Sequence, residues 1–300
     1  MDNQIDLSIV IINYNTKDLT IRNLESIFNF TTNISYKVFI VDNGSKDGSV
    51  EAILERFNNK ITSEVLKVYD TKINNGFAKG NNIPTCDINS RYVLYMNPDM
   101  EIKENVFYKM VDFMDLNQDI DFSTCTLKYP DNEIQHNIKT SPTFLVNLLI
   151  LLKLHNFFPN IKILKDYFLT DFNYNIESKV EQIMGAFVFA RYESIKKLGF
   201  WNEEYFLWWE DVDLFKKAHD NNSRVFYTPI TSVIHYEGKS FFQLNSLSRQ
   251  KRFNIGLLIY SKKYFKDYEY WVLKLLSYLS LALAWATQIL KIRPRGQGKI

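Results

Sequence analysis

The chain has 300 residues, 46% of them hydrophobic, and it carries 36 basic and 34 acidic side chains. This length and composition support a packed core in one large domain or two modest ones, and they exclude a disordered chain. The near balance of charge does not indicate a nucleic-acid partner, so a polyanionic ligand would have to be bound by a local cluster of residues.

The cysteines and the N-terminus both bear on the cellular compartment. Cys86 and Cys125 have no close spacing to each other or to histidine. Neither a disulfide framework nor a zinc site is therefore predicted, and a reducing compartment is the simpler interpretation. The N-terminal segment MDNQIDLSIVIINYN has acidic residues where a signal peptide needs basic ones, and its apolar run is short. We therefore expect a cytoplasmic protein.

The first hundred residues alternate between strand patterns and helix patterns. Residues 7–12 (LSIVII) form an apolar run without alternation, as expected for a parallel strand covered on both faces. The alternation predicts a mostly parallel sheet flanked by helices, in which ligands bind at the carboxyl ends of the strands. The order continues with a helix at 19–30, a strand at 36–42, a helix at 49–57, a strand at 64–70, a loop opening a helix at 74–83, and a strand at 91–96.

Polar side chains gather at the predicted strand ends. This coincidence is the first indication of a site. The pairs are Asn13 with Asn15, Asp42 with Asn43, Asn74 with Asn75, and Asn97 with Asp99.

The second half of the chain departs from this alternation. From about 131 to 178 we expect an insertion whose apolar helical stretch, 142–158, is too short and interrupted for a membrane span. The insertion would pack on the sheet or shape an acceptor groove. A strand, a helix, a turn at Gly199 and a helix beginning near Glu210 follow, and one or two further strands end at His235. We therefore predict one catalytic domain over 1–240.

Asp99 ends an apolar strand at the turn Asn97-Pro98-Asp99. The simplest interpretation is a plain turn, because proline restricts the backbone, with Asp99 as the cap of the next helix. His235, however, also ends an apolar run, TSVIH. A carboxylate and an imidazole that converge at strand ends can bind Mg²⁺ or Mn²⁺, with phosphate oxygens and water as the remaining ligands.

The segment FLWWEDVDLFKKA places three acids at the start of a helix. Acidic residues in a first turn stabilise the helix dipole, which is the ordinary interpretation. Trp208 and Trp209, directly before Glu210 and Asp211, also offer flat faces for stacking on a sugar, beside a carboxylate that can accept a proton. Core packing of each tryptophan is the alternative.

Asp42, in IVDNGSKDGS, has two interpretations. It fits an Asx turn that ends a strand, and it also fits a carboxylate that binds the base or ribose of a nucleotide. The loop NNGFAKGNN has neither the Walker A spacing nor the G-x-G-x-x-G spacing. The sequence therefore gives no P-loop and no dinucleotide-binding signature.

The ordered motifs IINYN, VDNGSKDGS, NNGFAKGNN, LYMNPD, MGAFVFAR, GFWNEEYFLWWEDVDL and VIHYEGKS together resemble inverting glycosyltransferases of family 2. The resemblance covers about residues 7–240 and is closest to the rhamnosyltransferase-like branch of bacterial surface-polysaccharide enzymes. It implies the GT-A fold, an α/β fold with a mostly parallel central sheet, and it implies a nucleotide-sugar donor, a divalent cation (Mg²⁺ or Mn²⁺) and association with the cytoplasmic side of the membrane.

The resemblance also implies roles for individual residues. Asp42 matches the nucleoside-binding aspartate, Asn97 and Asp99 match the outer positions of the D-x-D motif, and Asp211 matches the general base of the E-D motif. His235 matches a histidine that completes the metal site in relatives. Many members have aspartate where this chain has Asn97. The nucleotide-sugar site is expected to contain Asn13, Asp42, Gly76, Asn81, Asn97 and Asp99, and the acceptor site Trp208, Trp209 and Glu210.

These roles imply transfer of a sugar with inversion at the anomeric carbon, to a saccharide or lipid-linked acceptor in bacterial surface-polysaccharide synthesis. The branch resemblance suggests dTDP-rhamnose as the donor, with UDP-hexoses or UDP-galactofuranose as alternatives. A glycosidase would use Glu210 and Asp211 but leave Asp99 without a role. A non-catalytic nucleotide-sugar-binding scaffold is the other alternative, and retention of Asp211 argues against it.

The C-terminal segment, 241–300, is predicted to be a helical extension. Its stretch LLSYLSLALAWATQIL has sixteen residues between Lys274 and the cations Lys291, Arg293 and Arg295. That length is short for a membrane span and suits an interfacial helix that buries one face in the bilayer. The helix would otherwise pack on its own domain or in a homodimer. We expect a peripheral protein on the inner face of the cell membrane.

Overall fold

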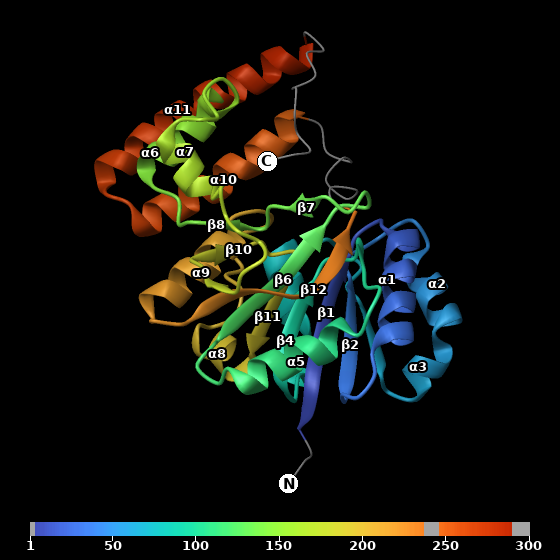
Figure 1. The fold of residues 1–300 in the computed structure, drawn as a ribbon. Coiled ribbons are helices and arrows are strands. Elements are labelled where there is room, and N and C mark those ends of the chain that lie inside the picture. The colour runs from blue at the N-terminus through green and yellow to red at the C-terminus, as the bar shows by residue number, and fades with distance from the viewer. Residues whose placement is uncertain (1–3, 237–245, 290–300) are drawn as a thin grey trace.

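The computed structural model describes residues 4–236 and 246–289. Within these residues, ten strands form one sheet and two form a small separate ladder (Figure 1). The strands are β1 (Ile5–Asn13), β2 (Tyr36–Asp42), β3 (Leu66–Asp70), β4 (Ser90–Met96), β5 (Met100–Glu101), β6 (Phe122–Lys128), β7 (Ile134–Gln135), β8 (Ile138–Lys139), β9 (Ser178–Lys179), β10 (Gln182–Ile183), β11 (Phe187–Arg191) and β12 (Val225–His235).

The helices cover the sheet and build a separate layer at one end of it (Figure 1). They are α1 (Lys17–Phe30), α2 (Ser49–Arg56), α3 (Asn58–Thr62), α4 (Phe77–Asn82), α5 (Val106–Leu116), α6 (Phe144–Leu151), α7 (Lys162–Phe168), α8 (Tyr192–Lys197), α9 (Glu210–Asp220), α10 (Ser246–Tyr264) and α11 (Asp267–Ile289), with 3₁₀ turns η1 (Ile83–Asp87) and η2 (Leu154–Asn156).

The large sheet has the order β3-β2-β1-β4-β11-β6-β12-β5, with β7 beside β6 and β9 beside β12. Strands β1 to β4 pair in parallel, which confirms the predicted alternation of strands and helices. β11 runs antiparallel to both β4 and β6, and β5 runs antiparallel to β12. The carboxyl end of β4 therefore lies beside the beginning of β11.

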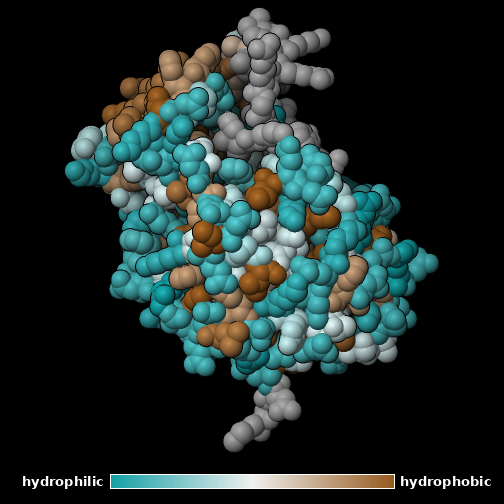
Figure 2. Space-filling view, viewed as in Figure 1, coloured by the Kyte–Doolittle hydropathy of each residue, from teal (hydrophilic) through white to brown (hydrophobic). Residues whose placement is uncertain are grey.

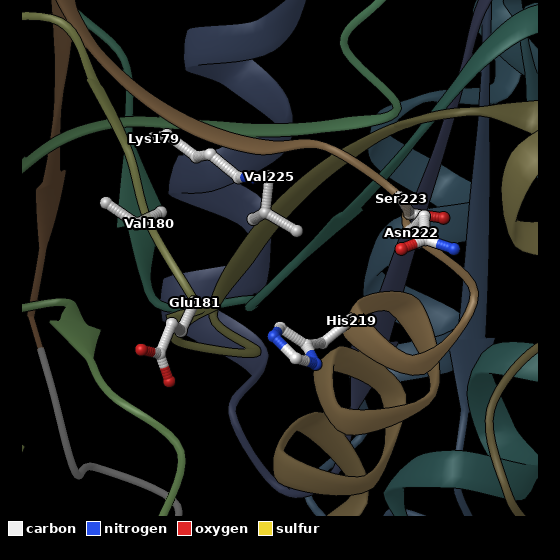
Figure 3. A pocket seen from close by; sticks show the side chains of 7 residues that line it. All are labelled: Lys179, Val180, Glu181, His219, Asn222, Ser223 and Val225. Carbon is white, nitrogen blue, oxygen red and sulfur yellow. The ribbon is translucent and has the colours of Figure 1, made fainter.

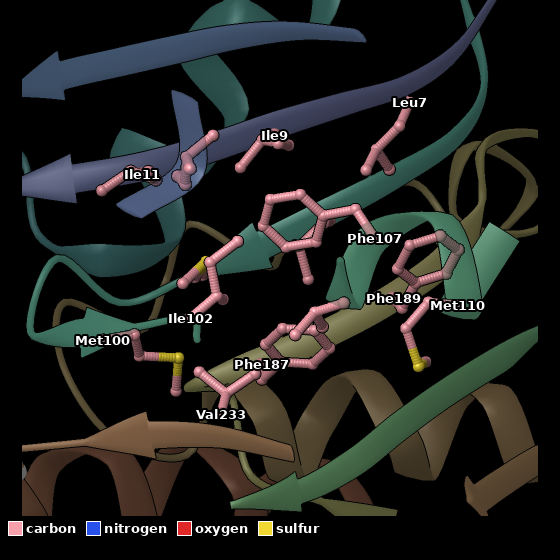
Figure 4. Close-up of a cluster of buried hydrophobic side chains, with 14 of the residues drawn as sticks. Leu7, Ile9, Ile11, Met100, Ile102, Phe107, Met110, Phe187, Phe189 and Val233 are labelled. Carbon is pink, nitrogen blue, oxygen red and sulfur yellow. The ribbon is translucent and has the colours of Figure 1, made fainter. Parts of the chain in front are cut away.

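Two apolar layers hold the helices on the sheet. On one face, Phe107 and Met110 of α5 pack over Ile9, Phe187 and Phe189 of the strands (Figure 4). On the other face, α8 and α9 pack through a second cluster. Fully burying such a side chain contributes about 1.5–3 kcal/mol, so these layers fix the strand ends on which the site depends.

A third cluster joins the insertion to the C-terminal helices. Leu151 of α6 packs with Leu257 of α10 and Leu273 of α11, and the cluster reaches Tyr205 and Trp209 in the loop before α9. Within the insertion, α6 packs on other helices and not on the sheet. Other parts of the insertion do lie on the sheet, through Ile138 and Tyr174. No helix among the described residues is long and apolar enough to cross a bilayer.

Candidate active site

The carboxyl ends of β1 and β2 form a buried polar corner. Asn13 pairs with Asp42 in the parallel register, and its Nδ2 donates to Asp42 Oδ2 at 2.6 Å and to Ser45 Oγ at 3.0 Å. The Ser45 N–H donates to Asp42 Oδ1 at 2.8 Å. This bond closes an Asx-type turn. Asp42 is only 1% exposed, and its hydrogen bonds hold the carboxylate in place.

The loop before α4 is pinned from two sides. Asn43 Nδ2 donates to the Gly76 carbonyl at 2.9 Å, and the Phe77 N–H donates to the Phe206 carbonyl at 2.7 Å. Gly76 has φ of 82°, and a Cβ there would lie 2.4 Å from the Phe206 oxygen. Only glycine fits this backbone position. Asn81 is buried on α4 and donates to the Phe77 carbonyl.

Asp99 and His235 are brought together by β5 and β12. His235 pairs with Met100 in the register of these strands, and its Nε2 lies 3.3 Å from Asp99 Oδ1. Asp99 is 4% and His235 2% exposed. Asn97 Nδ2 is 3.5 Å from the same imidazole nitrogen. The structure thus unites the Asn-Pro-Asp turn with the histidine 136 positions later, as the strand-end pattern suggested.

A glutamine holds the outer nitrogen of His235. Gln135 Oε1 lies 2.7 Å from His235 Nδ1, and Gln135 is 1% exposed. With Nδ1 directed at the Gln135 oxygen, Nε2 is the ring nitrogen that faces the Asp99 carboxylate. Two electron-rich atoms placed in this way suit a divalent cation with one or two protein ligands and phosphate oxygens as the others. Among the described residues no group of three or more acidic, histidine or cysteine side chains is placed to hold a metal ion.

Asp211 stands on the first turn of α9 and faces the start of β11. Its Oδ2 accepts from the Gly185 N–H at 3.0 Å, and its Oδ1 from the Val212 N–H at 2.8 Å. The next residue, Ala186, accepts from the Asn97 N–H at 2.9 Å. Two neighbouring residues thus bind Asp211 on one side and the Asn-Pro-Asp turn on the other, which links the predicted base to the predicted metal site.

The protein interior shifts the acidity of Asp211. Desolvation by the surrounding protein raises the pKa of the Asp211 carboxyl, and this outweighs the opposing effects of the Gly185 and Val212 N–H groups and of the positive charge of Lys139. A raised pKa makes a carboxylate a better proton acceptor. The position of Asp211 beside the Asn-Pro-Asp turn and the shifted pKa together support a functional carboxylate.

The two tryptophans before α9 differ in burial. Trp209 is 5% exposed, and its ring packs on Phe253 and Tyr260 of α10. This is the core-packing alternative, and the ring leaves little surface on which a sugar could stack. Trp208 is half-buried, and its role in acceptor binding stays a prediction.

Glu210 is buried beside Asp211. Its Oε2 has no hydrogen-bond partner, and desolvation together with the Asp211 charge raises the pKa of Glu210 well above its usual range. A direct contact of this side chain with an acceptor stays a prediction. It would require movement of the surrounding protein, since Glu210 is only 6% exposed.

This burial predicts a pH-dependent stability. The raised pKa means that Glu210 favours the folded state fully below its unfolded pKa, near 4.5, and that this contribution is lost as pH rises through the folded pKa. We therefore expect Glu210→Gln to raise the melting temperature at pH 8 but not at pH 4.5. Thermal unfolding across this pH range measures it, with the exposed Glu193→Gln as control. A Tm difference that does not grow with pH would contradict the prediction.

A separate hollow lies away from these residues. It has a volume of about 430 Å³ and is lined by residues of the β9–β10 segment, the C-terminal end of α9 and the start of β12 (Figure 3). None of the predicted site residues lines it. Its lining side chains are Lys179, Val180, Glu181, His219, Asn222, Ser223 and Val225.

Sequence reasoning missed three residues that build the site. Gln135 orients His235, Gly185 binds Asp211, and Phe206 supports the Gly76 loop. The sequence carried a signal for Gly185, because this glycine stands directly before an apolar strand pattern. In the structure, a Cβ at this position would lie 3.3 Å from the Asp211 Cβ. Gln135 and Phe206 carry no local pattern that marks them.

Comparison with known proteins adds sequence relatives. Rhamnosyltransferase WbbL of Escherichia coli (strain K12) is 23% identical over 182 residues, which cover 56% of this chain. The matched region spans 64% of that relative's length. At this identity, the relative shows similarity but does not fix the sugar.

Solved structures share the fold. The Pyrobaculum calidifontis mannosyltransferase PcManGT, determined with GDP-Man and Mn²⁺, superimposes with a TM-score of 0.58 at 14% identity, covering 98% of this chain and 77% of that one. S. aureus TarS 1-349, in complex with UDP-GlcNAc, gives 0.55 at 16% identity over 88% and 69%. The predicted GT-A fold is confirmed. The family profile of Glycosyl transferase family 2 matches residues 8–172, more than half of the chain. The chain therefore belongs to glycosyl transferase family 2.

Proposed function

We propose that the protein is an inverting, metal-dependent glycosyltransferase that uses a nucleotide-sugar donor. The observation that carries this proposal is the placement of Asp211, whose carboxylate is bound by Gly185 while the adjacent Ala186 binds Asn97. The segment Gly185-Ala186 thus lies between a proton acceptor and a candidate diphosphate site. The nucleotide-sugars named with PcManGT and TarS support the donor class.

The residues have the following roles in this proposal. Asp211 accepts the proton of an acceptor hydroxyl, and that oxygen forms a bond to the anomeric carbon as the bond from that carbon to the nucleoside diphosphate breaks. The attack comes from the face opposite the leaving group, so the configuration inverts. Asn13, Asp42, Gly76 and Asn81 shape the nucleoside side of the site.

The leaving group departs near Asp99 and His235. These residues, with Asn97 beside them, would hold Mn²⁺ or Mg²⁺, which neutralises negative charge that develops on the diphosphate. Gln135 keeps the His235 ring oriented for this ligand set.

We infer that dTDP-rhamnose is the first donor to test, because WbbL is a rhamnosyltransferase, with UDP-hexoses and UDP-galactofuranose as alternatives. A panel of nucleotide-sugars, each assayed for release of the nucleoside diphosphate with Mn²⁺ or Mg²⁺, tests the donor class. Proton NMR of the glycoside formed tests inversion. Failure to bind or turn over any donor would contradict the transferase proposal and favour a scaffold.

We further propose that α11 docks on an anionic membrane surface, where a lipid-linked acceptor of surface-polysaccharide synthesis would be found. Hydrophobic residues gather over this end of the molecule (Figure 2). They recur at helical spacing along one stripe of α11, as in interfacial helices. The exposed apolar side chains are Tyr268, Trp271, Val272, Leu275, Tyr278, Leu279, Leu283 and Trp285.

Charge favours a membrane over a second copy of the chain. The Lys274 ammonium lies 4.6 Å from the Trp271 ring centroid, and Lys266 is exposed at the junction of α10 and α11. Cations beside an apolar stripe suit anionic headgroups. Lys291, Arg293 and Arg295, which were predicted to add to this charge, lie outside the described residues.

A hollow beside the site suits the apolar part of such an acceptor. It has a volume of about 240 Å³ and lies between the loop before α9 and helix α10. Its polar group is the Arg252 guanidinium, which stacks on Phe206 at 4.5 Å. The other lining residues are Tyr205, Leu207, Ile255, Gly256 and Ile259.

Leu275→Glu is expected to weaken binding to phosphatidylglycerol vesicles by about tenfold or more, because burial of a leucine contributes about 1.5–3 kcal/mol. Leu275 is 71% exposed. The control is Leu116→Glu, since Leu116 is 77% exposed at the end of α5. Vesicle co-sedimentation measures the binding, and light scattering measures the oligomeric state. Equal binding of both variants, or a dimer that Leu275→Glu dissociates, would contradict the membrane proposal.

A further inference from the structure

The loop before α9 has a strained backbone. Trp208 and Trp209 have φ of 67° and 75°, the left-handed region that costs a residue with a side chain about 1–2 kcal/mol. Strain of this kind persists only where surrounding contacts hold it, and it is concentrated at functional sites. Asp211 follows two residues later, so whatever holds this loop also fixes the carboxylate.

Helix α10 provides the first of these contacts. The Trp209 ring lies 5.4 Å from the Phe253 ring and 5.3 Å from the Tyr260 ring, measured between centroids. Gly256, one turn from each, faces the indole. A Cβ at this glycine would lie 2.5 Å from Trp209 Cδ1, closer than carbon atoms can approach. Trp209 can therefore pack against α10 because Gly256 has no side chain.

A buried carboxylate on α9 provides the second contact. Asp213 has no exposed side-chain surface, and its Oδ1 accepts from Lys263 Nζ at 2.8 Å and from the Tyr264 hydroxyl at 2.8 Å. The Tyr205 hydroxyl donates to the same oxygen at 3.3 Å. Lys217 Nζ is 3.9 Å from the other oxygen. A buried carboxylate requires such partners, and two of the closest come from the end of α10.

We propose that α10 is part of the catalytic apparatus: Lys263 and Tyr264, which hold Asp213, and Gly256, which seats Trp209, are positioning residues for the base Asp211. The inference rests on the proposed function only in the role given to Asp211. Asp211 lies between the two attachment points, Trp209 and Asp213, on the first turn of one helix. In this proposal the C-terminal extension fixes the position of Asp211 through α10, in addition to the membrane docking proposed for α11.

The predicted kinetic effect is selective. Misplacement of a reacting group by about 1 Å costs on the order of a hundredfold in rate. Lys263→Met should therefore lower kcat by about 10- to 100-fold and change the Kd of the nucleoside diphosphate less than about threefold, because Asn13 and Asp42 lie on other elements. Lys263→Arg keeps the charge and should restore most of kcat.

The control is Lys262→Met, on the exposed neighbour of Lys263 in the same helix. Hydrogen exchange of the amides of 208–213 gives a readout that needs no activity, and we expect faster exchange in Lys263→Met than in Lys262→Met. Gly256→Ala tests the second contact. Alanine in a helix interior normally stabilises by about 1 kcal/mol relative to glycine. Here we expect a lower melting temperature and faster exchange at 208–213.

The outcomes separate the two proposals. Faster exchange together with lower kcat and near-normal nucleotide affinity supports positioning by α10. Equal exchange in the two lysine variants, or faster exchange with unchanged kcat, overturns it. A wild-type protein that turns over no donor contradicts the proposed function, and the exchange comparison then decides alone whether α10 holds the first turn of α9.

Discussion

Asp211→Asn is expected to lower kcat of sugar transfer by about 10²- to 10⁴-fold, the range that a positioned general base contributes. Asparagine has nearly the same shape, and its carbonyl oxygen still accepts from the Gly185 N–H that binds Asp211 Oδ2. Donor affinity should therefore stay within a few-fold of wild type. The measurement is nucleoside-diphosphate release under saturating donor, together with a direct binding titration of the nucleotide.

The pH profile adds a second signature of Asp211. Burial raises the pKa of this carboxyl, and only its ionised form accepts a proton. We therefore expect kcat/KM of the wild type to decline as pH falls through a pKa above that of an ordinary aspartate, and Asp211→Asn to lack this limb. Asp220→Asn, at the exposed end of the same helix, is the control. Full activity in Asp211→Asn would assign the base elsewhere.

Asp99→Asn should weaken Mn²⁺ binding in the presence of nucleoside diphosphate by at least about tenfold, with a larger loss in kcat/KM. The reason is geometric, because Asp99 Oδ1 and His235 Nε2 are 3.3 Å apart and Asp99 carries the negative charge of the pair. Electron paramagnetic resonance of free Mn²⁺ measures the affinity directly. Asp112→Asn, on the exposed side of α5, provides the charge-matched control.

Gln135→Leu tests the support behind His235. Loss of such an outer-shell partner typically costs about 10- to 100-fold in metal affinity. Gln135 accepts from the imidazole Nδ1, so its removal should weaken Mn²⁺ binding although no metal ligand has changed. Wild-type turnover that persists in excess EDTA would remove the metal role of Asp99 and His235 altogether.

The N-terminal half of the fold was predictable because its signals are local. The run Leu7 to Ile12 is buried on both sheet faces, and such a run predicts a parallel strand whatever surrounds it. The strand ends then place Asn13, Asp42 and Asn97 at one edge without further knowledge. The start of α9 at Glu210 was equally readable from its acidic first turn.

Pairings between distant short segments could not be predicted in this way. The two-residue strand β5, which positions Asp99 beside His235, has no periodicity of its own and exists only because β12 supplies its hydrogen bonds. The antiparallel direction of β11 depends in the same way on β4 and β6. Gln135 is set by such a pairing too, since it lies opposite Leu127 across β6 and β7.

The burial of Trp209 could not be predicted from the sequence for a different reason. An aromatic pair beside acidic residues is as typical of a ligand-binding surface as of a core. The residues that decide between the two, Phe253 and Tyr260 of α10, lie more than forty positions away. The sequence of α10 gives one hint, because Gly256 interrupts an otherwise helix-favouring stretch. A glycine within a helix often marks a close approach by another part of the protein.

The antiparallel course of β11 has a consequence for redesign. The chain enters the catalytic centre at Gly185 after it has completed the insertion, and ladder bonds to β4 and β6 on both sides then anchor it. A different insertion before Met184 would thus still be followed by the same anchored strand, β11. Under the proposed function, the insertion is the segment to exchange in a search for new acceptor preferences, with the graft boundary near 180.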